Sequence, residues 1–500
     1  MPWIDTSAID EHIFRAKLSP EDQFQIYNGL DACVTAEIFD YLSEVLRKSN
    51  DSSARDLYNF ERGMQGLALS MMRRGFLTDS YERRLQIEKY SAIKSRVESI
   101  LNRFAAVIWG LPLNPFSPKQ LKSFFYSAMK LPEQHSIVNK QRIVSCNREA
   151  LEKLQAYFHT VPIINCIFEA RDAQKKIFAL SAVSQSGRFY STFSPASTET
   201  GRWSSSKDAF GEGGNAQNIT PELRKIFISD PGRKLIHFDQ KQAESVVVGL
   251  ILSGLGDGRY LEAFRSGDLH TIVAKMIWPG EVYDKKSAEA IFYRHFTYRD
   301  MAKRGGHLSN YRGKPRRMSE ALKLPLELCE HFQRTYYKAF GLEKFHNYIA
   351  KEIQLHQSLL TPLGMQRHFF GNPYDEEVLR EAIAFIPQST VSQITSLIAW
   401  RLWITEPRLE PLTHDHDGFT WQFPDDRGIE RELVGLIREA GNISISFRDK
   451  SIAIPLEIST GWNWAPEKHP VFFGKNPDGL REYKEIDSRE RSTWKERLVT

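Results

Sequence analysis

The stretch LEPLTHDHDGFTWQF, residues 409–423, decides the fold. Apolar and polar residues alternate on both sides of its centre, and the Asp417-Gly418 dipeptide is a strong hairpin signal. The pattern predicts two antiparallel strands over residues 408–424 around a tight turn that contains Asp417. Taken alone, this aspartate could simply be a turn residue.

A second aspartate follows a predicted strand much earlier in the chain. The segment KLIHFDQK, residues 234–241, is short, apolar and bounded by polar residues, which is typical of a buried strand. This strand is expected to end at Asp239. An aspartate at that place could also cap the helix that follows, so the residues around the two aspartates have to decide their meaning.

Between these aspartates lies a predicted helix with one unusual face. The segment TYRDMAKRGGHLSNYRG, residues 297–313, places four side chains at four-residue steps, namely Arg299, Lys303, His307 and Tyr311. Side chains at this spacing share one drifting face of a helix. Two cations and two rings suit a triphosphate with a stacked base, whereas the alternative is an ordinary basic surface helix. Gly305 and Gly306 favour the first interpretation. Each costs about 1 kcal/mol relative to Ala, which indicates a close approach of backbone or ligand, or a bend.

These segments resemble, in order, the motifs of the family A DNA polymerases, the group of bacterial DNA polymerase I and many phage replicases. FDQKQAES, residues 238–245, is similar to motif A, and HDHDG, residues 414–418, is similar to motif C. The resemblance implies that Asp239 binds two metal ions and that Asp417 is the second metal ligand. It also implies a further metal contact from the backbone carbonyl of Gln240.

The contacts with the nucleotide are implied mainly by a third motif. RDMAKRGGHLSNY, residues 299–311, is similar to motif B. The resemblance implies that Arg299 clamps the outer phosphates and that Lys303 neutralises them and donates a proton to pyrophosphate. His307 and Tyr311 are the implied walls of the base pocket.

The resemblance extends over about residues 20–465 and includes contacts with DNA. TGRWSSS (200–206) and NAQNI (215–219) resemble the segment that follows the primer–template minor groove, within a polar stretch predicted as a loop. PQSTVSQ (387–393) resembles the stretch that contacts the templating strand. Glu244 is the implied steric gate against ribonucleotides. The implied DNA-binding residues are Arg202, Gln217, Asn218, Gln388 and, near the primer end, His416.

The implied fold class is α+β: a right-hand polymerase with an antiparallel palm sheet and helical fingers and thumb, plus a small N-terminal exonuclease remnant. The expected order is a truncated exonuclease-like segment (1–60), palm entry and thumb (61–180), palm with motif A (181–255), fingers with motif B (256–385), palm with motif C (386–466) and a charged, solvated C-terminal extension (467–500). The implied reaction adds dNTPs to primer–template DNA with two Mg²⁺ ions, for which Mn²⁺ can substitute.

The first 60 residues contain part of a proofreading site. SPEDQFQIYNGLDACVTAEIFDYLSEVL, residues 19–46, predicts a helix capped by Ser19. Its YNGLDACVT portion resembles the third motif of the family's 3′–5′ exonuclease, with Tyr27 and Asp31 as the functional residues. The other carboxylates of such a site normally lie well upstream, where this chain is too short. We therefore expect no proofreading by this chain alone. The segment is either a remnant or the place where a separate exonuclease-bearing chain docks, as in a split replicase of phage type.

Several residues depart from the family pattern. His307 stands where Phe or Tyr is frequent, and Arg312 replaces the usual Gly. Gly418 occupies the place of the motif C Glu, so a third-carboxylate role has no support there. Asp415 is nearby, but its side chain is expected to point away from the metal side of the turn.

Composition excludes some classes of protein. The 500 residues are 41% hydrophobic and 26% charged, and no apolar run approaches the roughly 20 residues of a membrane span. Acidic residues near the start argue against a secretory signal peptide, which favours a cytoplasmic protein of a bacterium or a phage-infected cell without a membrane partner. The four separated cysteines are expected to be buried thiols. A net charge of +5 permits a polyanionic partner.

Two other functions stay open on the sequence alone. A single-subunit RNA polymerase would share the palm and its aspartates, but Glu244 opposes this alternative. A catalytically silent nucleic-acid-binding homologue is compatible with the altered motif C.

Overall fold

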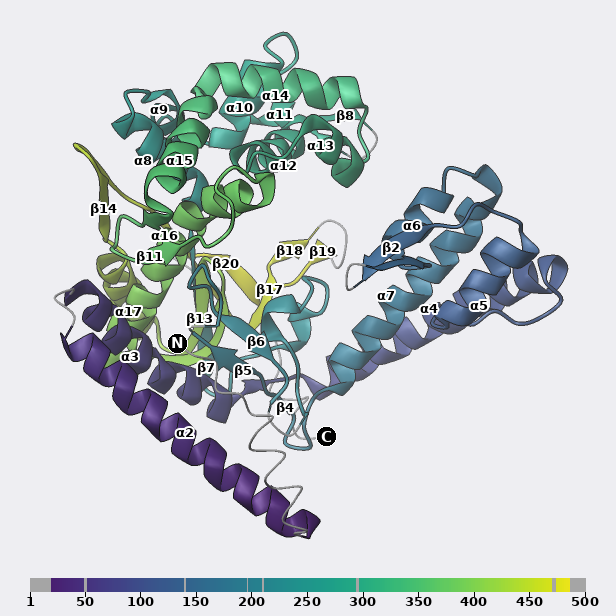
Figure 1. The fold of residues 1–500 in the computed structure, drawn as a ribbon, viewed down its shortest axis with the longest axis horizontal. Coiled ribbons are helices and arrows are strands. Elements are labelled where there is room, and N and C mark those ends of the chain that lie inside the picture. The colour runs from purple at the N-terminus through teal and green to yellow at the C-terminus, as the bar shows by residue number, and fades with distance from the viewer. Residues whose placement is uncertain are drawn as a thin grey trace. The chain divides into compact units, whose positions relative to one another are not determined.

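The computed structural model describes residues 19–48, 52–138, 141–195, 197–208, 211–293, 296–469 and 474–485. The chain divides into two compact units, residues 1–63 and 64–500. Helices predominate among the described residues, and the second unit also contains a central sheet (Figure 1).

The described part of the first unit is helical. It comprises α2 (Pro20–Lys48) and the beginning of α3 (Ser52–Arg74). The hydroxyl of Ser19 accepts a hydrogen bond from the amide of Asp22 at 3.1 Å, so the predicted start of the first helix is confirmed. Cys33 on α2 is exposed, which contradicts the expectation of a buried thiol.

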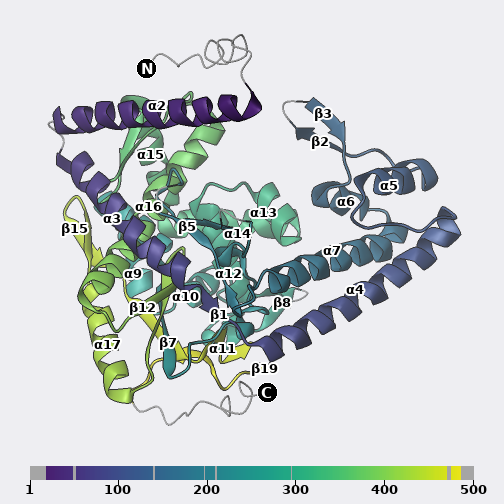
Figure 2. The ribbon, with the colours of Figure 1, turned by 90° about the horizontal axis from the view of Figure 1, so that it is seen from below.

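A helical arm forms the beginning of the second unit. Its two long helices, α4 (Ser80–Ile108) and α7 (Val161–Ser181), run side by side in both views (Figures 1 and 2). Shorter elements complete it: α5 (Pro118–Lys122), the π-helix η1 (Ser123–Ala128), the hairpin β2 (His135–Val138) and β3 (Gln141–Val144), α6 (Arg148–Leu154) and η2 (Phe158–Thr160). The predicted helical character of residues 61–180 is confirmed, and the β2–β3 hairpin is an addition that the sequence pattern did not indicate.

The centre of the second unit is a six-stranded sheet with the order β12–β13–β7–β16–β20–β17. Its strands are β7 (Arg233–Gln240), β12 (Glu410–Asp415), β13 (Gly418–Pro424), β16 (Leu456–Gly461), β17 (Asn463–Pro466) and β20 (Gly479–Glu482). Neighbouring strands are antiparallel except β17 and β20. The predicted strand at 234–241 and the predicted hairpin at 408–424 are confirmed, and they pair with each other through β13.

Alternation along β7 gives this sheet two different faces. Every second residue, namely Lys234, Ile236, Phe238 and Gln240, is buried, and Leu235 is the one further buried residue of the strand. The side-chain amide of Gln240 donates to the carbonyl of Val391 at 3.0 Å, so this face packs against α16 (Glu376–Thr405). His237 and Asp239 point to the opposite face because successive side chains of a strand alternate. That second face carries the polar groups that a ligand can reach.

The helix α16 tests the expectation that nothing resembles a membrane span. By length and composition it could cross a membrane, and it is the one such helix among the described residues. However, 78% of its most apolar window is buried inside the protein. Such burial is that of a core helix, and α8 (Ala243–Gly254) is among the helices that pack against it.

A bundle of helices follows the strand β7 and lies to one side of the sheet (Figure 1). After α8 it comprises α9 (Arg259–Arg265), α10 (Leu269–Ile277), α11 (Lys285–Ala288), α12 (Tyr298–Asn310), α13 (Pro315–Leu322), α14 (Leu326–Phe340) and α15 (Leu342–His356). The predicted helix with the unusual face is confirmed as α12. A capping box between Thr297 and Asp300 fixes its first turn.

The remaining described elements are α17 (Arg427–Ala440) and short pieces around the sheet. They are β1 (Phe76–Leu77), β4 (Arg188–Phe189), β5 (Thr192–Ser194), β6 (Ser204–Ser206), η3 (Ala216–Asn218), η4 (Arg224–Ile226), β8 (Ile291–Tyr293), β9 (Phe296–Thr297), β10 (Ser358–Leu360), β11 (Gln366–His368), β14 (Ser444–Phe447), β15 (Lys450–Ala453), β18 (Lys468–His469) and β19 (Gly474–Lys475). The polar stretch predicted as a loop thus contains the strand pair β5–β6.

The C-terminal region differs from its prediction as a solvated extension over residues 467–500. Strand β20 returns to the sheet between β16 and β17. Asn476, which precedes it, is buried and exchanges amide hydrogen bonds of 3.0 and 2.8 Å with Asn463. A dense mixture of charges hid these few pairing residues. Residues 486–500 lie outside the described residues.

The sheet and α17 are joined by a buried ion pair that yields a stability prediction. Lys234 donates to both carboxylate oxygens of Glu430 at 2.9 Å, and the two side chains are only 5% and 7% exposed. Removing one partner of such a pair leaves an uncompensated buried charge, which costs about 3–5 kcal/mol. We expect Glu430→Ala to lower the free energy of unfolding in urea by that amount, and Lys234→Met combined with Glu430→Leu to cost less. The exposed pair Asp449–Lys450 is the control. A Glu430→Ala effect as small as that of Asp449→Ala would contradict the prediction.

Candidate active site

The two predicted metal aspartates meet because β7 pairs with the hairpin. Asp239 is the register partner of Gly418, the first residue of β13. The backbone amide of Gln240 donates to the carbonyl of Asp417 at 3.0 Å, which fixes the turn beside the end of β7. Two residues that are 178 positions apart in the sequence are thereby held together where β7 ends and β13 begins.

Burial and mutual repulsion shift the titration of both carboxyls. Burial raises the pKa of Asp239 to about 8, and the charge of Asp417 and a hydrogen bond between the two carboxyls add to the shift. Burial also raises the pKa of Asp417, with the charges of Asp415 and Glu244 acting in the same direction. Two like charges this close are stable only when a proton or another cation lies between them.

The residues at this place fit divalent metal ions. Hard cations such as Mg²⁺ prefer carboxylate and carbonyl oxygens and keep several water molecules, so two carboxylates with substrate oxygens form an adequate ligand set. The partly buried carboxylates of Asp239 and Asp417 offer such oxygens. The side chain of Gln240 is committed to α16, so only its backbone carbonyl can contribute.

The surroundings of the hairpin turn correct one expectation. Asp415 is the register partner of Gly418, which in turn pairs with Asp239, so the side chain of Asp415 lies on the same face of the sheet as Asp239. The expectation that it points away from the carboxylates is wrong. Its nearest cation is Arg224, 3.8 Å away. A Cβ atom on Gly418 would lie 2.5 Å from the carbonyl oxygen of Phe238, which explains why no larger residue stands there.

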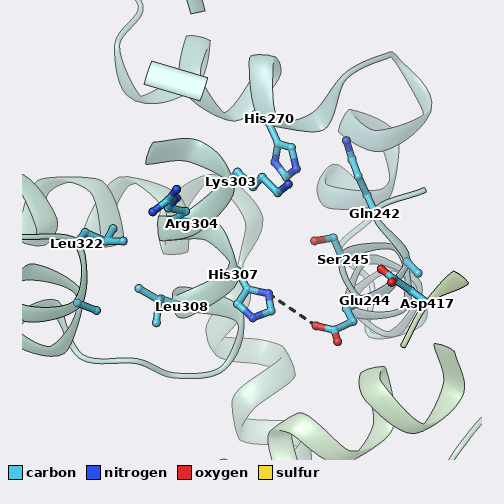
Figure 3. A pocket seen from close by; sticks show the side chains of 12 residues that line it. Gln242, Glu244, Ser245, His270, Lys303, Arg304, His307, Leu308, Leu322 and Asp417 are labelled. Carbon is cyan, nitrogen blue, oxygen red and sulfur yellow. Dashed lines mark ion pairs between the residues drawn. The ribbon is translucent and has the colours of Figure 1, made fainter. Parts of the chain in front are cut away.

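Beside the aspartates lies a pocket of about 560 Å³. Its walls come from α8, α10, α12, α13 and the hairpin, and Figure 3 shows their side chains around one space. The principal lining residues are Gln242, Glu244, Ser245, His270, Lys303, Arg304, His307, Leu308, Leu322 and Asp417. The predicted Lys303 and His307 therefore do face the same space as the predicted Asp417.

Glu244 is the most connected residue of the pocket. Its carboxylate accepts hydrogen bonds from Arg202 and from the hydroxyl of Tyr311. The ring nitrogen Nδ1 of His307 lies 3.7 Å from the same carboxylate (Figure 3). Burial raises the pKa of Tyr311 well above its ordinary value, with the charge of Glu244 adding to the shift, so the phenol stays protonated and donates. The side chain of Gln388 also hydrogen-bonds this phenol.

Arg299 has a partner that the sequence did not indicate. Its guanidinium donates to both oxygens of Asp268, at 2.7 and 3.1 Å, so in this state it is held by protein. His270, two residues further along, was also missed and faces the pocket (Figure 3). Burial lowers the pKa of His270 to about 4, and the charges of Arg299 and Lys303 act in the same direction. Only the fold brings α10 against α12, so no local pattern could have found these two residues.

The other predicted DNA contacts lie around the hairpin. The side-chain amide of Gln217 donates to the carbonyl of Trp203 at 3.1 Å, whereas Asn218 and His416 are exposed. Sequence reasoning missed His414, which is buried and stacks on Trp203 with ring centroids 4.8 Å apart. This stack joins the segment of Arg202 to β12.

The two predicted exonuclease residues lie in the other compact unit. Tyr27 and Asp31 are exposed on α2, one helical turn apart. The backbone carbonyl of Asp31 accepts a hydrogen bond from Thr35 at 2.6 Å, which is ordinary within a helix. Nothing among the described residues joins them into a group with further metal-binding side chains.

Comparison with known proteins agrees with the sequence motifs. The family model of "DNA polymerase family A" matches residues 85–465. A DNA polymerase I of Helicobacter pylori strain J99 is 26% identical over 410 residues, which are 77% of this chain and 41% of that protein. A DNA polymerase I of Caldicellulosiruptor bescii is 28% identical over 256 residues, 48% of this chain and 28% of that protein. The chain thus spans less than half of the length of these relatives.

A solved structure shares the fold. The POL domain of Pol1 from M. smegmatis, in complex with DNA primer-template and dNTP, superposes with a TM-score of 0.66 at 20% identity, covering 81% of this chain and 70% of that chain. The predicted α+β right-hand fold is confirmed by this likeness. This likeness does not test whether the N-terminal segment is an exonuclease remnant.

The raised pKa of Asp239 predicts how stability depends on pH in the absence of metal. The carboxyl has an ordinary value of 3.8 and a folded value of about 8. Its protonated form is therefore favoured by folding, and this contribution is complete below the ordinary value and lost as the pH rises through about 8. Asp239→Asn cannot ionise, so with EDTA we expect it to melt at a higher temperature than the unaltered chain above pH 8, with a smaller difference near pH 5. Asp449→Asn is the exposed control, and equal melting temperatures at both pH values would contradict the assignment.

Proposed function

The chain belongs to DNA polymerase family A, and on this premise we propose that it is a template-directed DNA polymerase that adds dNTPs to the 3′ end of a primer. The observation that carries the proposal is the close pair Asp239–Asp417 at one edge of a pocket whose other wall carries Lys303. Negative charge for cations and positive charge for phosphates thus face each other across a space of about 560 Å³. A nucleoside triphosphate with divalent ions requires this arrangement.

The metals give the pocket its chemistry. Asp239 and Asp417, with the backbone carbonyl of Gln240, would hold two Mg²⁺ or Mn²⁺ ions, which activate the primer 3′-hydroxyl and stabilise the charge of the leaving pyrophosphate. Lys303 neutralises the phosphates and donates a proton to the pyrophosphate. Arg299 has to exchange Asp268 for the outer phosphates, a bidentate recognition for which guanidinium is suited.

Selection of the sugar falls to Glu244. We propose that its carboxylate, which accepts hydrogen bonds from Tyr311 and Arg202, blocks the entry of a ribose 2′-hydroxyl. Tyr311 and His307, with ring centroids 4.9 Å apart, wall the base. This placement disfavours a single-subunit RNA polymerase. We propose that Arg202, Gln217, Asn218, Gln388 and His416 contact primer–template DNA.

The described architecture supports an assignment of the parts of the hand. In this proposal the six-stranded sheet is the palm, the bundle α9–α15 forms the fingers and the arm α4–α7 is the thumb. Each lies within the range expected for it, except that the palm also takes residues 479–482 of the region expected to be an extension.

The two-metal assignment is tested by primer extension. We expect Asp239→Asn and Asp417→Asn each to lower the rate of nucleotide addition by at least about a thousandfold, because transition-state stabilisation of about 4 kcal/mol or more is lost. Affinity for primer–template DNA should change little. Asp449→Asn, at an exposed position in the turn between β14 and β15, should extend normally. Parallel reactions with dNTPs and rNTPs separate a DNA polymerase from an RNA polymerase and from a silent homologue. Near-normal extension by either active-site variant contradicts the assignment.

A finer proposal concerns the N-terminal unit. Tyr27 and Asp31 alone cannot form a two-metal hydrolytic site, so we infer that the 500-residue chain does not proofread by itself. A partner chain that completes the site is favoured over a mere remnant by the apolar surface of α2. Phe24, Phe39 and Tyr41 expose 66%, 55% and 56% of their surface, which is unusual for aromatic side chains of a solvated helix.

A mismatch-excision assay distinguishes these possibilities. The chain alone should extend a matched primer and leave a mismatched 3′ end intact, and adding an exonuclease-bearing partner should restore excision. Asp31→Ala should remove excision from the mixture without changing polymerisation, whereas Asp40→Ala on the same helix should change neither. Strong 3′–5′ degradation by the chain alone, abolished by Asp31→Ala, contradicts the proposal.

A further inference from the structure

Behind the nucleotide pocket lies a closed ring of three hydrogen bonds. The side-chain amide of Asn310 donates to the hydroxyl of Tyr260 at 3.1 Å. The hydroxyls of Tyr260 and Tyr336 are 2.7 Å apart. The hydroxyl of Tyr336 donates to the side-chain oxygen of Asn310 at 3.0 Å. The three residues come from α12, α9 and α14 and are 3%, 1% and 2% exposed.

The direction of each bond in this ring is determined by the donors available. Tyr336 uses its one proton toward Asn310, so it has to accept the proton of Tyr260. Tyr260 in turn accepts from the amide of Asn310. Each hydroxyl therefore donates once and accepts once within the ring. A buried ring satisfied in this way is rigid, because any one displacement leaves buried polar groups without partners.

The ring adjoins both members of the sugar gate. Asn310 directly precedes Tyr311, whose hydroxyl donates to Glu244. Ser245 directly follows Glu244, and its side chain is hydrogen-bonded to Tyr260. Burial raises the pKa of Tyr260, and its hydrogen bonds with Ser245, Tyr336 and Asn310 act against that shift. One hydroxyl thus contacts the sequence neighbour of each gate residue, on α12 and on α8.

Two glycines leave room for the side chains of Tyr336 and Tyr260. A Cβ atom on Gly306 of α12 would lie 3.2 Å from the hydroxyl oxygen of Tyr336. A Cβ atom on Gly249 of α8 would lie 3.1 Å from the ring of Tyr260. The glycine pair that the sequence associated with a close approach on α12 therefore meets aromatic side chains of α14, since Gly305 faces Phe332 in the same way at 2.7 Å.

We propose that the hydroxyl of Tyr260 is a positioning group for sugar selection: through Asn310 and Ser245 it sets the distance between Tyr311 at the end of α12 and Glu244 on α8. The inference rests on the proposed role of Glu244 as the steric gate. Discrimination against a single hydroxyl depends on small displacements of the blocking carboxylate, so a gate between two helices needs a fixed link between them. The ring is that link, and its three residues are buried and do not line the pocket.

The test is Tyr260→Phe, which removes the hydroxyl oxygen and keeps the packing of the aromatic side chain. Single-nucleotide incorporation is measured for dNTP and for the matching rNTP, and selectivity is the ratio of their kcat/KM values. We expect selectivity for dNTP to fall about three- to tenfold, the effect of one lost buried hydrogen bond. Tyr336→Phe breaks the same ring from another helix and should act alike, so a folding failure of one variant does not end the test. The control is Tyr337→Phe, whose hydroxyl contacts the carbonyl of Ser309 outside the ring and whose selectivity should be unchanged.

A double-mutant cycle separates positioning from general loosening. If the ring acts through the gate, Tyr260→Phe should lower selectivity in the unaltered chain and have almost no further effect in a Glu244→Ala background. Full additivity of the two effects, or unchanged selectivity in both Tyr260→Phe and Tyr336→Phe, overturns the proposal. Glu244→Ala alone should increase use of rNTP relative to dNTP. If it does not, the gate itself is wrongly assigned and the positioning role falls with it, whereas a normal Glu244→Ala response with an inert ring rejects the ring alone.

Discussion

The approach of two like charges, Asp239 and Asp417, is the constraint on which the rest of this structure depends. The two carboxyls repel each other, and burial makes their ionisation costlier still, as the raised pKa of both shows. The fold maintains this arrangement because strand pairing and side-chain hydrogen bonds fix the backbone around Asp239. β7 pairs with β13 and β16 at the same time, and the Gln240 side chain between them is anchored to α16. A pair held in this way has a strong electrostatic preference for cations over a solvated, ion-free state.

In the proposed function, Glu244 is the central residue for nucleotide recognition, as Asp239 and Asp417 are for the chemistry. Its partners come from separate parts of the chain, Arg202 from the segment before the sheet and Tyr311 from the bundle. Nucleotide and primer–template would both have to approach a carboxylate that already links the two parts. Arg299 is likewise held by Asp268. In the proposed function, binding would therefore exchange existing ion pairs for new ones, which would limit the gain in affinity and make geometry the main source of selectivity.

Local patterns predicted much of this arrangement, and particular residues show where they failed. The capped helix start at Ser19, the strand with Asp239 and the hairpin with Asp417 depend on neighbours in sequence, and all are found. The prediction for Asp415 was wrong because the direction of its side chain depends on the register of three strands, not on its own strand alone. Strand β20 was not predicted, because its four pairing residues lie within a dense mixture of charges and give no periodic signal. Arg312, in the place of a usual Gly, adopts a positive φ of 57°, a conformation that favours glycine and that the departure alone could not reveal.

The sequence by itself determined the class of fold, the choice of Asp239 and Asp417 as candidate metal ligands and the face of α12, because ordered motifs with fixed spacing carry that information along the chain. Only the tertiary structure decided what surrounds them: that Asp268 holds Arg299, that His414 stacks on Trp203 and that Tyr260, Tyr336 and Asn310 close a ring behind the pocket. These contacts join helices and strands that are far apart in the chain. Their partners are chosen by packing and by the need to satisfy buried polar groups, and neither condition leaves a pattern in any one segment.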